Sequence, residues 1–191
     1  MNETVALYYD TEFEREAVKI LPGQCYAAAR DMLIVTVLGS CVSACLWDPA
    51  RRIGGMNHFM LPGAGDSARM GVYAMELLIN RMLKLGAERS RLVAKVFGGA
   101  AVLQGMEAMN IGSQNSAFVL HFLREEGIVV AAQDLNDVCA RKVCFSPHDG
   151  KARVKRLGAL RGESLERRER DYLARLTGGA AGGEVEIFGP R

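Results

Sequence analysis

Charge of a single sign is what this sequence most clearly lacks. Its 191 residues carry 24 Lys and Arg against 22 Asp and Glu, a formal net charge of +2. Domains that bind nucleic acid are strongly basic, so this balance argues against a nucleic-acid partner. The hydrophobic fraction of 49% excludes disorder as the state of the whole chain. The length fits one ordinary domain, with or without a short appendage.

A long apolar run is also missing. The uncharged stretch over residues 33–47 is interrupted by Thr36, Gly39 and two serines, which makes it too short and too polar to span a bilayer. The first residues lack the basic start and the apolar stretch of a secretory signal. We therefore expect a cytoplasmic protein without membrane insertion, in which the cysteines stay reduced.

The cysteine spacings do not favour a metal site. The five cysteines are an odd number, and no two of them have the Cys-x-x-Cys spacing that is typical of zinc ribbons. Two of the three histidines, His121 and His148, are expected on a helix and in a turn. We predict no metal and no cofactor, and we interpret four cysteines as packing or incidental thiols: Cys25, Cys45, Cys139 and Cys144.

Hydrophobic periodicity and turn residues predict more strands than helices. A loosely held acidic start and a helical turn at 13–19 are expected first. The expected strands are 24–27, 32–38, 42–47, 53–61, 92–97, 128–132, 138–145 and 152–157. Helices are expected at 67–85, between Ser113 and Gly127, and at 163–176. Because the strands often follow one another directly, the pattern predicts an α+β layered domain rather than strict β-α-β winding.

Cys41 lies on a glycine-containing turn, Gly39-Ser40-Cys41-Val42, between two apolar strands. Such a turn can expose a nucleophile and direct backbone N–H groups at an oxyanion. If the hairpin of 42–47 and 53–61 centres on Ala50, cross-strand partners have numbers that sum to about 100, and Cys41 lies beside His58. A histidine partner turns a thiol into a nucleophile. The residues alone still favour the plainer interpretation, a buried thiol and a satisfied histidine.

A second glycine pattern, at residues 63–68, matches the dinucleotide fingerprint G-x-G-x-x-A and opens a predicted helix. Pro62 breaks the tight strand entry, and no acidic residue ends a second strand about 20 residues later, as the fingerprint requires. We interpret this segment as a surface turn.

The composition changes after Leu157, which divides the chain into a main domain at 1–158 and an appendage at 159–191. The appendage consists of a charged helix, a glycine-rich linker and a short apolar tail at 184–191, which we predict to bind a partner or to fold back as an added strand. Residues 151–170 hold eight basic and three acidic residues. A solvated surface is the plainer interpretation of this stretch, and docking on an acidic partner is the alternative. The helix has a narrow apolar stripe: Leu165, Tyr172, Leu173 and Leu176.

Three segments resemble the CheD family of bacterial chemoreceptor glutamine deamidases: 35–42 (Val-Thr-Val-Leu-Gly-Ser-Cys-Val), 45–49 (Cys-Leu-Trp-Asp-Pro) and 55–62 (Gly-Met-Asn-His-Phe-Met-Leu-Pro). Shorter matches continue through 95–100, 110–115, 134–135, 141–145 and 154–157. The resemblance implies that 1–158 is a deamidase domain. It also implies a layered α/β sandwich similar to the cytotoxic necrotizing factor deamidases.

The family is implied to be a cysteine-dependent amidohydrolase, a protein-glutamine glutaminase of chemotaxis. It converts receptor glutamines to glutamates and releases ammonia without a cofactor. Its substrates are the cytoplasmic domains of chemoreceptors, and it also contacts a CheC-type phosphatase. Two alternatives remain open, namely a non-catalytic adaptor that binds receptors or such a phosphatase, and an amidase that acts on another substrate.

The resemblance also implies the site residues. Cys41 would be the nucleophile and His58 its base and acid, with an oxyanion turn at Gly39 and Ser40. The third catalytic residue of the family is a threonine on the preceding strand. Thr36 is the only threonine on that strand, five residues before Cys41, whereas the family motif has its threonine six before, where this chain has Val35. The candidates for a substrate loop are Gly98, Gly99 and Asn115.

Overall fold

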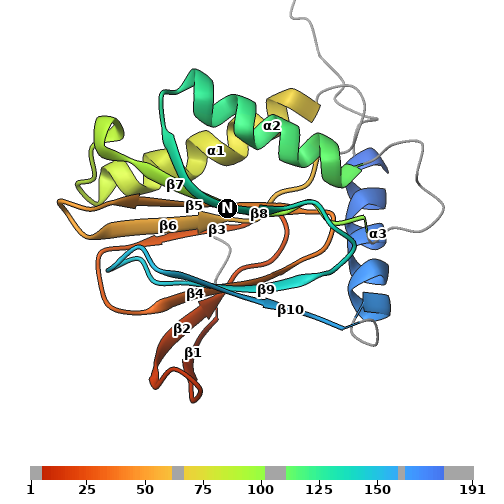
Figure 1. Ribbon diagram of the computed structural model, residues 1–191, viewed down its shortest axis with the longest axis horizontal. Coiled ribbons are helices and arrows are strands. Elements are labelled where there is room, and N and C mark those ends of the chain that lie inside the picture. The colour runs from red at the N-terminus through yellow and green to blue at the C-terminus, as the bar shows by residue number, and fades with distance from the viewer. Residues whose placement is uncertain (1–5, 62–66, 102–110, 159–161, 179–191) are drawn as a thin grey trace, which may run out of the picture.

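Two five-stranded sheets stack face to face, and two helices cover the outer face of one of them (Figure 1). The computed structural model describes residues 6–61, 67–101, 111–158 and 162–178. The two stacked sheets and the helices on one of them confirm the layered α+β architecture that the order of the predicted strands indicates.

The sheet that the helices cover has the order β3-β6-β5-β7-β8, and the other sheet has the order β1-β2-β4-β9-β10. The β2–β4 and β7–β8 pairs are parallel and all the other pairs are antiparallel, so both sheets are mixed. The strands of the helix-covered sheet are β3 (Cys25–Ala28), β6 (Ile53–Asn57), β5 (Val42–Asp48), β7 (Val93–Gly98) and β8 (Val129–Leu135). Those of the second sheet are β1 (Leu7–Asp10), β2 (Arg15–Lys19), β4 (Leu33–Leu38), β9 (Arg141–Phe145) and β10 (Ala152–Arg156).

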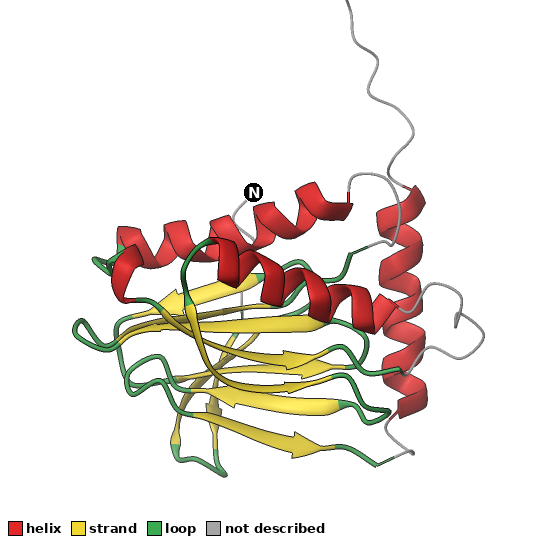
Figure 2. Cartoon of the chain, turned by 45° about the horizontal axis from the view of Figure 1, so that its top comes forward, coloured by secondary structure: helices red, strands yellow, loops and turns green. Residues whose placement is uncertain are grey.

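Helices α1 (Ser67–Lys84) and α2 (Ile111–Glu125) lie side by side on the first sheet, and a short 3-10 helix, η1 (Arg89–Arg91), precedes β7. Helix α3 (Gly162–Gly178) stands across the ends of both sheets, separate from the other two helices (Figure 2). No helix in the described ranges is both long and apolar enough to cross a membrane.

Two apolar layers form the core because the central strands bury both of their faces. Along β5, Val42, Ala44 and Leu46 pack toward the helices, while Cys41 and Cys45 belong to the layer between the sheets. Successive side chains of a strand point to opposite faces, so a strand buried on both faces has a continuous apolar run rather than an alternating one. This is why β5 is uncharged from Val42 to Trp47.

The expected helical turn at 13–19 is wrong, because Arg15–Lys19 is strand β2. The expectation of a loosely held start is also wrong for Leu7–Asp10, which is strand β1. Strand β2 pairs with β1 on one side and with β4 on the other, and these partners are not visible in local periodicity. The other expected elements exist, although α2 begins at Ile111, before Ser113. The glycine turn at 63–65, the linker at 179–183 and the tail at 184–191 lie outside the described residues.

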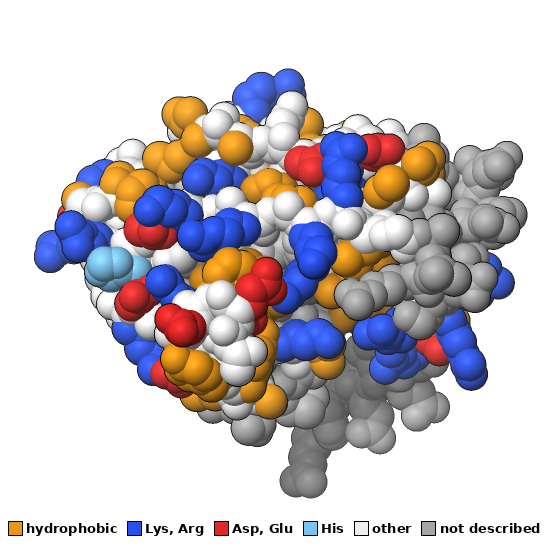
Figure 3. All heavy atoms as spheres, turned by 60° about the horizontal axis from the view of Figure 1, so that its bottom comes forward, with side chains coloured by type: hydrophobic (Ala, Val, Ile, Leu, Met, Phe, Trp, Pro, Cys, Tyr) orange, Lys and Arg blue, Asp and Glu red, His pale blue; other side chains and the backbone are white. Residues whose placement is uncertain are grey.

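Lysine and arginine side chains are spread over the lower face of the molecule with acidic side chains among them (Figure 3). Within the basic stretch, Arg156 pairs with Asp134 and Asp137 at 3.4 and 3.1 Å, and Lys151 pairs with Asp149 at 3.1 Å. Part of the basic stretch at 151–170 is thus neutralised by the chain's own carboxylates. The solvated surface is the interpretation that these pairs favour.

Candidate active site

The β5–β6 hairpin brings Cys41 and His58 to one face of the sheet. Val42 and Phe59 pair directly and exchange two backbone hydrogen bonds of 2.9 and 3.0 Å, and Cys45 pairs with Met56. Partner numbers therefore sum to 101, one more than the sequence predicts. In this register Cys41 and His58 are diagonal neighbours whose side chains point to the same face. Both side chains are buried, with relative exposures of 0% and 3%.

Thr36 fixes the orientation of the His58 ring from the opposite sheet. Its hydroxyl donates a hydrogen bond of 2.9 Å to the carbonyl of Ile20, and Oγ1 lies 2.8 Å from Nδ1 of His58. A hydroxyl has a single hydrogen, which Ile20 already takes, so Thr36 must accept its second bond from Nδ1–H. This assigns the neutral tautomer whose lone pair is on Nε2.

Nε2 of His58 carries the lone pair of the neutral ring. It is buried and makes no hydrogen bond to any residue that the structure describes. Burial lowers the pKa of His58 to about 3, although a hydrogen bond that involves Ile20 opposes this shift. The imidazole is therefore neutral at physiological pH.

The carbonyl groups of the turn Gly39–Cys41 are all satisfied from one side. Ala100 N–H donates to Gly39 O at 2.7 Å, Asn115 Nδ2 donates to Ser40 O at 2.8 Å, and Gly99 N–H donates to Cys41 O at 2.8 Å. Asn115 itself is anchored, since it accepts a bond of 2.8 Å from the Leu61 N–H. These bonds hold the turn rigidly and direct its N–H groups to the other side.

The predicted substrate-loop residues therefore lie against the turn Gly39–Cys41. Gly98 has a φ of +113°, and a side chain there would run into the carbonyl of Cys41. Gly99 has a φ of +69°, and a side chain there would meet the hydroxyl of Ser116. Glycine is required at both positions because the backbone has a positive φ there and a neighbouring group leaves no room for a side chain. Both residues therefore shape the turn through their backbone. Their contact with substrate stays a prediction.

The N–H groups of Gly39–Cys41 converge on the carboxylate of Glu169, a residue of α3. Gly39 N and Cys41 N lie 2.9 and 3.3 Å from Oε1, and Ser40 N and Ser40 Oγ lie 2.8 and 2.7 Å from Oε2. Glu169 is 1% exposed, so these four bonds compensate the loss of water around its charge. Three consecutive N–H groups thus bind one anion, and their action on the oxyanion of a reaction stays a prediction.

The surroundings of Cys41 disfavour its thiolate form in this arrangement. Its burial raises its pKa well above the usual value for cysteine, and the charge of Glu169 and a hydrogen bond to that carboxylate raise it further. A raised pKa favours the neutral thiol over the more reactive thiolate while Glu169 is in place.

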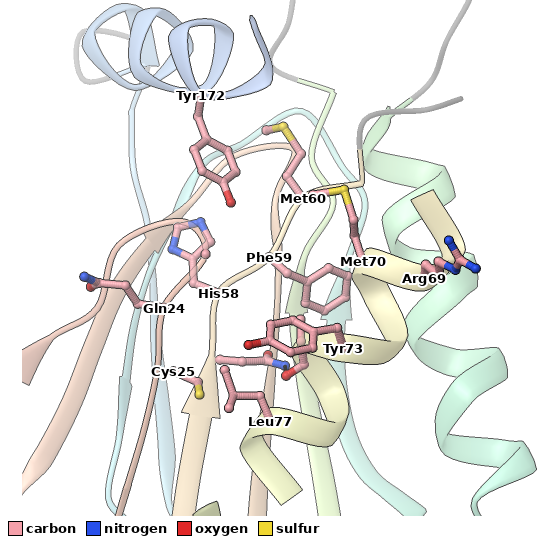
Figure 4. A pocket seen from close by; sticks show the side chains of 13 residues that line it. Gln24, Cys25, His58, Phe59, Met60, Arg69, Met70, Tyr73, Leu77 and Tyr172 are labelled. Carbon is pink, nitrogen blue, oxygen red and sulfur yellow. Dashed lines mark hydrogen bonds between the residues drawn. The ribbon is translucent and has the colours of Figure 1, made fainter. Parts of the chain in front are cut away.

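Two cavities flank His58. A pocket of about 550 Å³ is lined mainly by apolar side chains of α1 and of the segment that follows β6, and Cys25, His58 and Tyr172 are also in its wall. Figure 4 shows Tyr172 reaching from α3 toward the His58 side of this pocket. A second cavity of about 40 Å³ lies under α3 between Thr36, His58 and Glu169. Helix α3 therefore contributes to the walls of both cavities.

The remaining cysteines are dispersed over the fold, and all five are free thiols. Cys25 packs under the helices, Cys45 between the sheets and Cys144 on the outer face of the second sheet. Among the residues described, no three side chains of metal-ligating type come together.

Glu169 is the site residue that sequence reasoning missed, because it was counted with the acids of a solvated helix. The helical repeat of the sequence could have indicated that Glu169 is buried. Glu169 lies four residues after Leu165 and four before Leu173, so the helical repeat places it within the apolar stripe. Both leucines are buried, and Tyr172 and Leu176 pack against the same layer.

Comparison with known proteins identifies the chain's relatives. Residues 60–156 match the family described as CheD chemotactic sensory transduction. A probable chemoreceptor glutamine deamidase CheD from Janthinobacterium sp. (strain Marseille) is 54% identical over 95% of this chain and 94% of its own length. The protein of the same name from Thiobacillus denitrificans is 55% identical with the same coverage. A probable chemoreceptor glutamine deamidase CheD 1 from Shewanella oneidensis is 50% identical over 95% of this chain and 92% of its own.

Proposed function

This chain belongs to the CheD family, and from that premise we propose that it hydrolyses the side-chain carboxamide of glutamines in chemoreceptors. One observation carries the proposal. The three N–H groups of Gly39–Cys41 surround a single anion position beside a thiol, and a histidine with a free lone pair lies on the same sheet face. This arrangement suits acyl transfer at an amide.

The first half of the reaction forms a thioester. Once the turn is free of Glu169, Nε2 of His58 takes the Cys41 proton and Sγ attacks Cδ of the substrate glutamine. The N–H groups of Gly39–Cys41 hold the oxyanion that develops on Oε1. Protonated His58 then gives its proton to the departing nitrogen, and ammonia leaves.

The second half restores the enzyme. His58 takes a proton from water, the hydroxide attacks the thioester, and Cys41 leaves and recovers its proton from His58. The net change consumes one water, releases one ammonia and converts glutamine to glutamate. Thr36 is a positioning residue throughout, because its bond to Nδ1 keeps the Nε2 lone pair available to the thiol.

Mass spectrometry of a receptor cytoplasmic fragment tests this assignment. Incubation with the parent chain should convert specific glutamines to glutamates, and Cys41→Ala should abolish the conversion. Cys45→Ala is the matched control, since Cys45 is buried between the same sheets four residues further on. Conversion by Cys41→Ala at the parent rate would disprove the nucleophile assignment.

The same experiment separates the alternatives. A parent chain that binds the fragment without converting it would be an adaptor. Thiol-dependent ammonia release from other proteins alone would indicate an amidase with another substrate. We also propose a cytoplasmic location, where receptor signalling domains lie, and a CheC-type phosphatase as a second partner, which a pull-down with that phosphatase tests.

A further inference from the structure

Glu169 occupies the position where a substrate would react. Its carboxylate accepts the N–H groups of Gly39, Ser40 and Cys41 and the hydroxyl of Ser40, at distances between 2.7 and 3.3 Å. The carbonyl groups of these same residues are bonded to Gly99, Ala100 and Asn115. No N–H of the turn is therefore left for a substrate while α3 is in place.

The chemistry of the occupant matches the proposed reaction. A glutamate side chain is the product of glutamine deamidation, so Glu169 presents the product's carboxylate to the subsite. A carboxylate binds backbone N–H groups more strongly than a neutral amide does. It also resists attack by a thiol, so the occupant is not consumed.

We infer that α3 is a built-in competitor of the substrate, with Glu169 seated as a product analogue in the subsite for the reacting glutamine side chain. The inference rests on the proposed function, because it assigns that site's regulation. In these terms residues 1–158 carry the catalytic groups and the helix of the appendage closes the site. Opening of α3 is then a step of every turnover.

The attachment of α3 is suited to reversible closure. Leu165 and Leu173 are its buried leucines, and Tyr172 and Leu176 are half-buried. Arg167, Asp171 and Arg175 are exposed on its outer side. A narrow apolar stripe and the Glu169 carboxylate thus contribute to holding the helix against the sheets. Activity falls by the fraction of molecules that are closed, and a receptor that binds only the open state displaces the helix.

Site-resolved alkylation tests the closure without any receptor. Glu169→Ala should raise the rate at which iodoacetamide modifies Cys41 by about tenfold or more, since the variant lacks the charged hydrogen bonds that hold the helix in place. Asp171→Ala is the matched control, because it removes an exposed carboxylate from the same helix. Peptide mass spectrometry separates Cys41 from the half-buried Cys139. An unchanged Cys41 rate in Glu169→Ala would overturn the inference.

Glu169→Gln tests the product analogy directly. Cys41 Sγ should attack Cδ of the introduced glutamine in the same chain, ammonia should leave with a proton from His58, and water should hydrolyse the thioester. One water is consumed, one ammonia is released, and the introduced side chain becomes glutamate. Mass spectrometry of the peptide should show this conversion, and Cys41→Ala/Glu169→Gln should retain glutamine. A Glu169→Gln chain that deamidates receptor but keeps its own introduced glutamine would overturn the inference.

The assays separate failure of the inference from failure of the proposed function. If receptor is deamidated by the parent and by Glu169→Ala at equal rates and the alkylation rates are equal, the function stands and the closure is wrong. If alkylation accelerates in Glu169→Ala but neither chain deamidates receptor, the closure stands and the proposed substrate is wrong. The closure and the function together predict a kcat/KM on receptor that rises about tenfold in Glu169→Ala and not in Asp171→Ala.

Discussion

Thr36 and His58 join the two sheets at the candidate site: Oγ1 of Thr36 accepts Nδ1–H of His58 at 2.8 Å and donates to Ile20 O at 2.9 Å. Thr36 lies on β4 of one sheet, and His58 directly follows β6 of the other. The bond sets the tautomer of His58 and leaves the lone pair of the ring on Nε2.

Thr36→Val should lower kcat on receptor about tenfold to a hundredfold with little change in KM, because the imidazole loses the partner that orients it. Valine keeps the side-chain volume, and the folded chain is expected to persist. Steady-state kinetics on a receptor fragment measure the effect.

Thr36→Ser is the control for this variant, since it restores the hydroxyl and should recover most of kcat. A purely structural role would lower kcat in neither variant and would appear only as a lower melting temperature. Full kcat in Thr36→Val would contradict the positioning role.

Gly98→Ala should reduce the deamidation activity about a hundredfold. The added methyl group would displace the carbonyl of Cys41 and with it the turn Gly39–Cys41. Gly127→Ala is its control. Gly127 has a φ of +66°, but a methyl group there meets nothing within 4 Å, so the change should cost about 1 kcal/mol of stability. Kinetics and urea unfolding of both variants check the pair, and equal activities would contradict the close-packing argument.

Acid should destabilise the fold through His58. Its pKa is about 3 in the folded chain and 6.5 as the ordinary value, so between these values the unfolded chain binds the extra proton. The free energy of unfolding should therefore fall as the pH drops below about 6.5, by up to about 1.4 kcal/mol per pH unit from this group.

His58→Gln removes that contribution, so its free energy of unfolding should depend less steeply on pH between 6 and 4. Urea unfolding at several pH values compares the two chains. Identical slopes in the parent and His58→Gln would rule out a buried neutral His58.

Asp48→Asn should lower stability by about 3 kcal/mol while leaving activity intact at moderate temperature. The buried carboxylate accepts the N–H groups of Ala50, Arg51 and Glu88, and Arg91 binds it at 2.8 Å. The Arg91 bond lowers the pKa of Asp48 to about 2. The contribution of ionised Asp48 to the free energy of unfolding is therefore present above about pH 4 and is lost as the pH falls toward 2.

Asp31→Asn is the matched control for Asp48→Asn, because its pair with Arg15 is exposed and should contribute little. Thermal unfolding of both variants gives the comparison. An equal loss in the two would contradict the role of burial.

Local sequence pattern was sufficient to predict much of the fold and the proximity of Cys41 and His58. Turn residues at 48–52 between two apolar runs determined the β5–β6 hairpin, and its geometry placed Cys41 beside His58 to within one residue of register. These features depend on neighbours close in the sequence. Strand β2 was missed because its partners lie in β1 and β4, and β-pairing depends on such contacts more than on the residues themselves.

The sequence alone determined most of the strands, the hairpin and the family resemblance. Only the tertiary structure decided which groups meet at the site. Thr36 reaches His58 because the two sheets stack, although its distance from Cys41 along the chain departs from the family motif. Glu169 lies about 130 residues from its partners at Gly39–Cys41. A helical repeat can show that its position faces inward, but whether a buried carboxylate finds N–H groups there depends on packing that no local pattern encodes.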